Sequence, residues 1–188
     1  LGQNGINYEY YETAQLSALP DFDSLVPVRT GTVSTFDIDV RDPGVDDDFA
    51  FRFTSLIYVG IPGDYTFFTT SDDGSQLFIA GALVVDNDGL HSSQEVSGVI
   101  TLPEGYHSIE VTMFERGGGQ SLTVNWQGPE TGGFKEQIGS GQFFLQEPSV
   151  DNDPPTLADP GPRTTNQGAS VSVLLSATDP NGDSLYFD

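Results

Sequence analysis

The chain has 188 residues, of which 28 are acidic and six are basic, so its formal net charge at pH 7 is −22. Such a charge repels nucleic acids and anionic membranes and argues against both as partners. The sequence contains no cysteine, which excludes disulfide bonds and cysteine nucleophiles. Because the chain has no disulfide bonds to stabilise it and is rich in carboxylates, its composition favours bound calcium as the stabilising element.

Residues 1–146 are organised as short runs of alternating apolar and polar side chains. Clear examples are residues 48–59, 64–71, 106–115 and 120–126. A period of two is typical of β-strands that bury one face. We therefore predict an all-β fold, an antiparallel β-sandwich or barrel, with no helix beyond a short turn near residues 16–25. Its predicted core includes Phe51, Phe53, Phe67, Val111, Leu122 and Trp126.

Glycine-containing turns separate the predicted strands. They are IPGD (61–64), SDDG (71–74), DNDG (86–89), LPEG (102–105) and RGGG (116–119). Gly, Asp and Asn tolerate the positive φ angles that tight hairpins require. We predict that these five turns are hairpin links between neighbouring strands.

The composition changes near residue 147. Residues 147–160 are rich in Pro, Asp and Asn, which indicates a linker, and residues 161–188 contain two further strand-like runs. These runs resemble the first strands of a cadherin-like or immunoglobulin-like module, but they are too few to close one. We therefore predict an incomplete β module, and interpret the chain as a fragment of a longer protein.

Acidic residues at this junction are candidate ligands for a structural calcium ion, which would stiffen the linker. The candidates are Asp151, Asp153, Asp179 and Asp183. A solvated acidic loop is an equally good interpretation of the same composition.

Two adjacent carboxylates, Asp72 and Asp73, stand between two strand-like runs. In an extended chain, neighbouring side chains point to opposite faces, so such a pair would not act on one ligand. On its own, the dipeptide is compatible with an ordinary Asp-Gly turn and solvated carboxylates.

Several motifs together resemble the PA14 domain family over residues 1–146. They are SDDGS (71–75), VDNDGLH (85–91) and GYHSIEVTMFERGGGQSLTVNW (105–126). PA14 domains are β-sandwiches found in glycosidases, toxins and adhesins. In the lectin members, the aspartates that Asp72 and Asp73 resemble are joined by a cis peptide bond and chelate a calcium ion. A cis bond brings the two Cα atoms to about 2.9 Å, so that both carboxylates face one ion.

The resemblance implies further ligands in residues 115–122. Gly118 and Gln120 would complete the calcium shell, and Gly119, Gln120 and Ser121 would line the sugar site together with Asp72 and Asp73. Flocculin-like members often have Asn or Asp in this loop, so Gln120 is a departure. The alternative is a flexible hairpin tip. The expected ligands are sugars with adjacent hydroxyls, of the fucose, mannose, glucose or N-acetylglucosamine type.

Residues 86–88 are interpreted as a turn, although their side chains are also compatible with a further calcium ion or with the rim of the sugar site. His91 and Trp126 are predicted to be structural.

Three functions are weighed on these grounds. The first is a calcium-dependent lectin domain of a cell-surface adhesin, a monomeric extracellular module. The alternatives are a calcium-stiffened extender without a ligand, and an accessory domain of a glycoside hydrolase. We predict no enzymatic activity, because the chain has two histidines and no cysteine, and because adjacent aspartates on one ion are poorly placed to flank a glycosidic bond.

Overall fold

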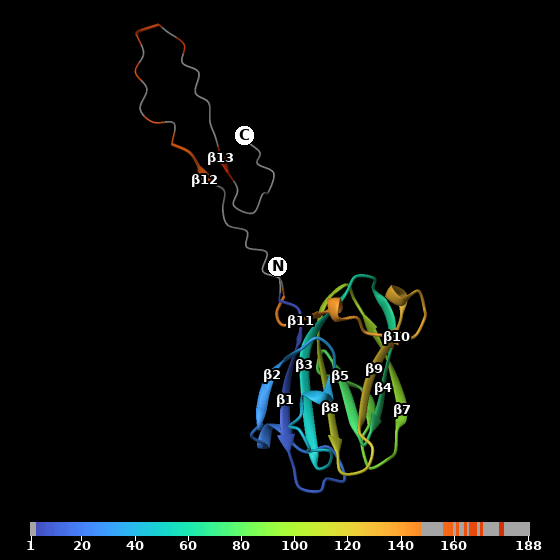
Figure 1. Ribbon diagram of the computed structural model, residues 1–188. Coiled ribbons are helices and arrows are strands. Elements are labelled where there is room, and N and C mark those ends of the chain that lie inside the picture. The colour runs from blue at the N-terminus through green and yellow to red at the C-terminus, as the bar shows by residue number, and fades with distance from the viewer. Residues whose placement is uncertain are drawn as a thin grey trace. The chain divides into compact units, whose positions relative to one another are not determined.

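The computed structural model describes residues 3–147 and, beyond them, residues 156–159, 161, 164, 166–168, 170 and 177–178 (Figure 1). The chain forms two compact units, residues 1–148 and 149–188. In the second unit, β12 (Thr156–Leu157) pairs with β13 (Ala177–Thr178) in antiparallel fashion. Among the described residues, no helix is long and apolar enough to cross a membrane.

The first unit consists of two antiparallel sheets. The seven-stranded sheet has the order β2–β1–β3–β8–β5–β6, with β11 also paired to β3. Its strands are β1 (Ile6–Glu12), β2 (Arg29–Val33), β3 (Phe49–Val59), β5 (Ser75–Ile79), β6 (Ala82–Asn87), β8 (Gly105–Glu115) and β11 (Phe143–Phe144). The four-stranded sheet has the order β10–β9–β4–β7. It contains β4 (Gly63–Asp72), β7 (Gln94–Leu102), β9 (Ser121–Gln127) and β10 (Glu136–Gln137).

Only short 3-10 turns interrupt the strands in the described part of the chain. They are η1 (Phe22–Ser24), η2 (Ile38–Val40), η3 (Pro129–Thr131) and η4 (Ser140–Gln142). The predicted all-β sandwich is therefore confirmed, and η1 falls inside the segment where a helical turn was expected.

The core contains the side chains that the period of two predicted. Along β3, Phe49, Phe51 and Phe53 are fully buried, and Phe67 of β4 and Trp126 of β9 are buried with them in one cluster. Leu122 packs against this cluster but is only partly buried. Each sheet contributes one apolar face, and burial of these aromatic faces is the main driving force for the sandwich.

The prediction that the five glycine turns are hairpins is wrong. Each of them joins a strand of one sheet to a strand of the other, as where β4 leads into β5 through residues 73 and 74. A hairpin does join β5 to β6, through Ala80 and Gly81, whose φ angles are 50° and 78°. A turn motif shows that the chain reverses, but which sheet receives the next strand depends on packing between distant segments.

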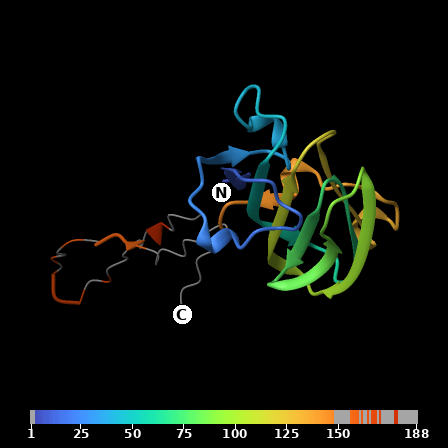
Figure 2. The same ribbon diagram turned by 90° about the horizontal axis from the view of Figure 1, so that it is seen from below.

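Five connections gather at one end of the sandwich, where the pairs Glu12–Phe49 and Phe49–Glu115 also place the end of β1 and the start of β3. The registers place Asp72 of β4 opposite Ser121 of β9, and Ser75 of β5 opposite Met113 of β8. The loops before β3, β5, β7 and β9 and the loop after β1 therefore meet at this end, which is the lower end in Figure 1 and faces the viewer in Figure 2. Gln3 and Leu145, whose backbones are hydrogen bonded, lie at the opposite end of the unit.

One glycine allows the two sheets to approach at their edge. At Gly98 in β7, an added Cβ would lie 1.7 Å from the carbonyl oxygen of Val84 in β6. We expect Gly98→Ala to lower the free energy of unfolding by about 3 kcal/mol, because backbone must move to admit the methyl group. Thermal and urea denaturation would measure the loss.

Gly139→Ala is the matched control for this substitution. Gly139 has φ of −67°, and a Cβ added there would meet no atom of the described residues within 4 Å. We expect this variant to be as stable as the unsubstituted protein or slightly more stable. Equal stability of the two variants would show that the contact between β6 and β7 is not tight.

Candidate metal centre

Asp72 and Asp73 lie where the chain leaves one sheet for the other. Asp72 is the last residue of β4, and the peptide bond to Asp73 is cis, as predicted. Gly74 follows in a position without room for a side chain, since an added Cβ would lie 2.7 Å from the backbone nitrogen of Gly89. Its carbonyl accepts a hydrogen bond from the backbone of Phe114 at 3.0 Å. The dipeptide is thus fixed against the end of β8.

A third carboxylate completes a cluster with the two aspartates. Oxygens of Asp72, Asp73 and Glu115 all lie within 4.8 Å of one another. Asp73 is 6% exposed, Glu115 is fully buried and Asp72 is half-buried. No basic side chain of the described residues forms an ion pair with any of the three. Three acidic groups therefore converge on one small volume.

Backbone amides from two loops hold the aspartates in place. Asp73 accepts hydrogen bonds from the amide of His91 at 3.0 Å and from that of Arg116 at 3.1 Å. Asp72 accepts one from the amide of Ser93 at 3.1 Å. The dipeptide therefore connects the loop of residues 88–93 with the loop of residues 116–120. These two loops are called the site loop pair below.

Glu115 is the least satisfied of the three carboxylates. Its Oε1 accepts a hydrogen bond from the amide of Gly117 at 2.6 Å, whereas its Oε2 is buried and has no hydrogen-bond partner among the described residues. Burial raises the pKa of Glu115 to about 7, and the negative charge of Asp73 adds to the rise. A buried carboxylate oxygen without a donor is costly, and a bound cation would remove that cost.

The structure brings part of the predicted loop to the aspartates. An added Cβ at Gly119 would lie 3.3 Å from Oδ2 of Asp72, and Ser121 pairs with Asp72 across the β9–β4 ladder. Gly118 instead donates its amide to Asp47 at 3.2 Å. Gln120 is half-buried between these residues, and its side chain makes no hydrogen bond within the described part of the chain.

Sequence reasoning missed Glu115 as a member of the cluster. The signal was present, since the period of two that buries Ile109, Val111 and Met113 also points Glu115 toward the core. It also missed Asp47 and the amides of His91 and Ser93. Backbone donors leave no trace in side-chain identity, so only the fold reveals them.

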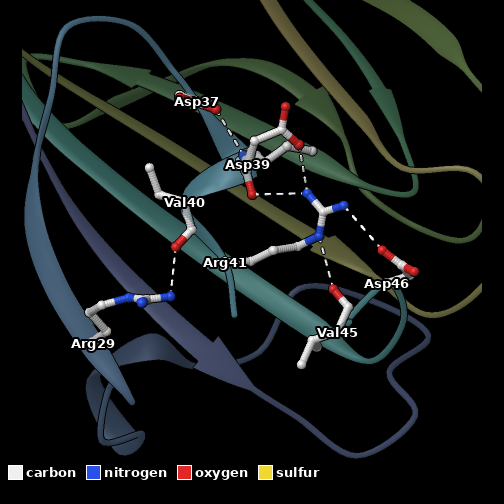
Figure 3. A network of polar contacts seen from close by, with 8 residues as sticks. Arg29, Asp37, Asp39, Val40, Arg41, Val45 and Asp46 are labelled. Carbon is white, nitrogen blue, oxygen red and sulfur yellow. Dashed lines mark hydrogen bonds and ion pairs between the residues drawn. The ribbon is translucent and has the colours of Figure 1, made fainter. Parts of the chain in front are cut away.

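An acidic segment, residues 37–48, lies beside the loop of residues 116–120. Arg41, whose side chain is 13% exposed, folds this segment by donating to the carbonyl of Val45 at 2.9 Å and to the carboxylate of Asp46 at 3.2 Å (Figure 3). Arg41 also binds Asp39, and Arg29 donates to the carbonyl of Val40. The folded segment ends at Asp47, which accepts the amide of Gly118.

Buried polar side chains support the dipeptide from inside the sandwich. Ser71 and Ser75 are 2.8 Å apart on either side of it, and the amide of Asn87 donates to Ser71 at 3.1 Å. Gln94 in turn donates to Asn87 at 2.9 Å. These bonds join β4 and β7 of one sheet to β5 and β6 of the other.

Residues 86–88 and His91 have structural contacts, as the turn interpretation favours. Asp86 accepts a hydrogen bond from Gln76 at 3.0 Å, and Asp88 accepts one from the amide of Leu19 at 2.8 Å. The ring of His91 lies 3.0 Å from the carbonyl oxygen of Asn87. The four candidate ligands near the linker, Asp151, Asp153, Asp179 and Asp183, lie outside the described residues.

The fold and the site together define the class of this domain, which is an antiparallel β-sandwich with a cluster of carboxylates at one end. The sequence model of the PA14 domain matches residues 2–138, and the chain belongs to the PA14 domain family. The family resemblance seen in the sequence motifs is thereby confirmed.

Comparison with known proteins places the domain among varied relatives. It is 27% identical over 145 residues to the anti-sigma-I factor RsgI3 of Acetivibrio thermocellus, a match that covers 75% of this chain and 21% of that protein. The chain thus spans about a fifth of the length of this relative. The solved PA14 sugar-binding domain from an RTX adhesin superposes with a TM-score of 0.63 at 22% identity, over 76% of this chain and 99% of that one.

A further solved structure shares the fold at lower identity. The A domain of epithelial adhesin 6 from Candida glabrata, solved in complex with Galβ1-3GlcNAc, has a TM-score of 0.60 at 14% identity, over 80% of this chain and 91% of that one.

Proposed function

We propose that this domain binds carbohydrate outside the cell through a calcium ion held by Asp72 and Asp73. The observation that carries the proposal is the convergence of the Asp72, Asp73 and Glu115 carboxylates at one end of the sandwich. Two adhesin domains of the same fold, one described as sugar-binding and one solved with a disaccharide, support the sugar as ligand.

The donor set fits calcium better than a softer metal. All three candidate ligands are carboxylates, the cluster contains no histidine, and the chain contains no cysteine. Calcium takes six to eight oxygens, so three carboxylates leave room for backbone or amide oxygens of Gly118 and Gln120. When bound, the ion would accept two adjacent hydroxyls of a sugar in its remaining positions.

The site loop pair forms the wall beside the aspartates and would select the sugar. Asp88 belongs to this loop pair, and Asp46 and Asp47 lie close to it. The surroundings of the site are therefore negatively charged. This charge favours neutral sugars of the fucose, mannose, glucose or N-acetylglucosamine type over sugars that carry carboxylates. Gly119 and Ser121, which lie next to Asp72, are the nearest candidates for contact with the sugar.

We propose further that the domain is a binding module and not an enzyme. Glycosidases place two carboxyl groups about 5 Å or about 6.5–9.5 Å apart on either side of a bond. Here the carboxylates converge and backbone amides fix two of them, an arrangement suited to holding an ion.

Two settings suit such a module in a longer chain. One is a cell-surface adhesin, which the solved adhesin domains favour. The other is a domain of an anti-sigma factor, which the 27% identical relative favours. In both settings the domain contributes the same chemistry. A calcium-stiffened extender without a ligand is the alternative that binding measurements would distinguish.

A glycan array probed with the labelled protein tests the proposal. We expect binding to neutral glycans in millimolar calcium and its loss in excess chelator, with restoration when calcium is returned. Isothermal titration with the corresponding monosaccharide should give a dissociation constant of about 1 mM, since few contacts surround the ion. Calcium binding without any glycan binding would favour the extender, and glycan binding that survives chelation would contradict the role of calcium.

A further inference from the structure

The outer face of the seven-stranded sheet is covered over only part of its area. Tyr11, Ala50 and Phe114 point outward and are buried with Phe22, which belongs to the segment between β1 and β2. Leu16 and Leu19 of the same segment pack against this small second core. Farther along the strands the cover ends, and the side chains there lie only partly buried; they include Arg52, Thr54, Gln76, Phe78 and Glu110.

Three adjoining depressions occupy the uncovered part. Their volumes are about 210, 630 and 270 Å³, and Glu110 lines all three. Arg52 lines the first two, and Phe78 lines the first and third. Together they form a groove across β1, β3, β8 and β5, which is called the sheet groove below. Four neighbouring strands span about 14 Å, longer than one sugar ring.

Arg52 is held rigidly in the sheet groove. Its Nε donates to Glu9 at 2.5 Å and its Nη1 donates to Asp23 at 2.6 Å. Its Nη2 makes no hydrogen bond with the described residues. Because two carboxylates fix the guanidinium plane, this group offers a ligand a donor whose orientation is already set.

Two further polar groups in the sheet groove lack partners. Thr112 lines the first depression and is 4% exposed, and its buried Oγ1 makes no hydrogen bond with the described residues. Glu110 accepts no hydrogen bond from any described residue, and burial raises its pKa. Glu110 is half-buried, so a ligand in the sheet groove can supply the hydrogen bonds that the described residues do not make to it.

The chemistry of the sheet groove restricts its ligand. A metal ion is disfavoured because, among the described residues, Glu9, Asp23 and Glu110 do not form a metal-type cluster. An anion is disfavoured because these three carboxylates surround one arginine. A neutral sugar suits the groups present, since each hydroxyl both donates and accepts, and the ring of Phe78 offers an apolar surface for a sugar face.

We infer that the sheet groove is a second binding site, which takes a neutral oligosaccharide or polysaccharide chain without any metal. Glu110 accepts hydrogen bonds from sugar hydroxyls, Arg52 donates to a sugar oxygen through Nη2, and Phe78 packs against a ring. This site goes beyond the calcium site at the end of the sandwich and does not depend on it.

Affinity gel electrophoresis in excess chelator tests the inference. The probes are xyloglucan, galactomannan and hydroxyethylcellulose, each cast into the gel. We expect at least one of them to retard the protein. Glu110→Gln and Phe78→Ala should each weaken that interaction about tenfold, because each removes one of the main contacts. Asp73→Asn, which alters the calcium site, should leave the retardation unchanged.

These measurements distinguish loss of binding at the sheet groove from loss of binding at the calcium site and from unfolding of the variant. Circular dichroism and thermal melting establish that each variant is folded. Backbone NMR shifts on addition of the probe should fall in residues 52–54, 76–78 and 108–112. The inference is overturned if no probe retards the protein in chelator, or if folded Glu110→Gln and Phe78→Ala bind as the unsubstituted protein does.

Discussion

Asp73→Asn is expected to abolish calcium-dependent sugar binding while the sandwich stays folded. The substitution keeps the shape of the side chain and one oxygen that can accept from the amide of His91. It removes one of three acidic groups from a cluster whose oxygens lie within 4.8 Å of one another. Because calcium affinity depends strongly on the number of charged ligands, we expect it to fall by about a hundredfold or more.

Asp73 is a sharper choice than Asp72 for this test. Asp73 is nearly buried and binds amides from both members of the site loop pair, whereas Asp72 is half-buried and binds one. Truncation to alanine would also release both loops, so loss of binding in Asp73→Ala would mix two causes. The asparagine variant keeps one of the two amide contacts and the volume of the side chain, so it disturbs the loops less than alanine does.

Asp64→Asn is the matched control. Asp64 lies on the same strand, β4, at the end opposite to the cluster, where it accepts a hydrogen bond from Thr101. The Asp64→Asn substitution changes the net charge by the same amount as Asp73→Asn but leaves the carboxylate cluster unaltered. Calorimetric titration of both variants with calcium, and then with sugar, gives the comparison. Wild-type, chelator-sensitive sugar affinity in folded Asp73→Asn would show that the aspartate pair is not the sugar site.

The sequence predicted the strands and the core well because both depend on local patterns. The alternation along residues 49–59 and 105–115 determines which face of each strand is buried, and the buried aromatic residues follow from it. The connections were predicted poorly. Whether the strand after Gly74 pairs with β4 or crosses to the other sheet depends on contacts with β8, which is distant in sequence.

In the candidate site, too, features that depend on local sequence could be predicted, and features that depend on contacts between distant segments could not. The cis bond between Asp72 and Asp73 followed from resemblance to a family, and no pattern of charge or hydropathy would have indicated it. Glu115 could have been identified from its inward position alone, at the end of an apolar alternation. The hydrogen bonds from His91, Ser93 and Arg116 are made by backbone amides, so they depend on how the loops meet in space.

Removal of calcium is expected to destabilise the domain most strongly at neutral and alkaline pH, through Glu115. The ordinary pKa of its carboxyl is 4.5, and in the folded chain without metal it is raised to about 7. Between these values the folded state binds more protons than the unfolded state. The free energy of unfolding therefore falls as the pH rises from 4.5 to 7, by about 3 kcal/mol for this group.

Glu115→Gln isolates this contribution from that of the other acidic residues. The glutamine keeps an oxygen for the amide of Gly117 and carries no charge at any pH. In chelator, we expect the variant to be more stable than the unsubstituted protein at pH 8, by up to about 3 kcal/mol, and the difference to vanish near pH 4.5. Urea denaturation at several pH values, in chelator throughout, measures the difference between the two curves.

The same pair of proteins then reports on calcium itself. At pH 8, saturating calcium should raise the melting temperature of the unsubstituted protein, because an ion that binds only the folded state stabilises it by mass action. It should raise that of Glu115→Gln much less, because the variant has lost a charged ligand. Glu115 then costs stability without metal and contributes stability with it, which makes folding of the loops dependent on calcium. An equal increase in both proteins, or a pH-independent difference in chelator, would show that Glu115 is neither a ligand nor the unsatisfied charge of this site.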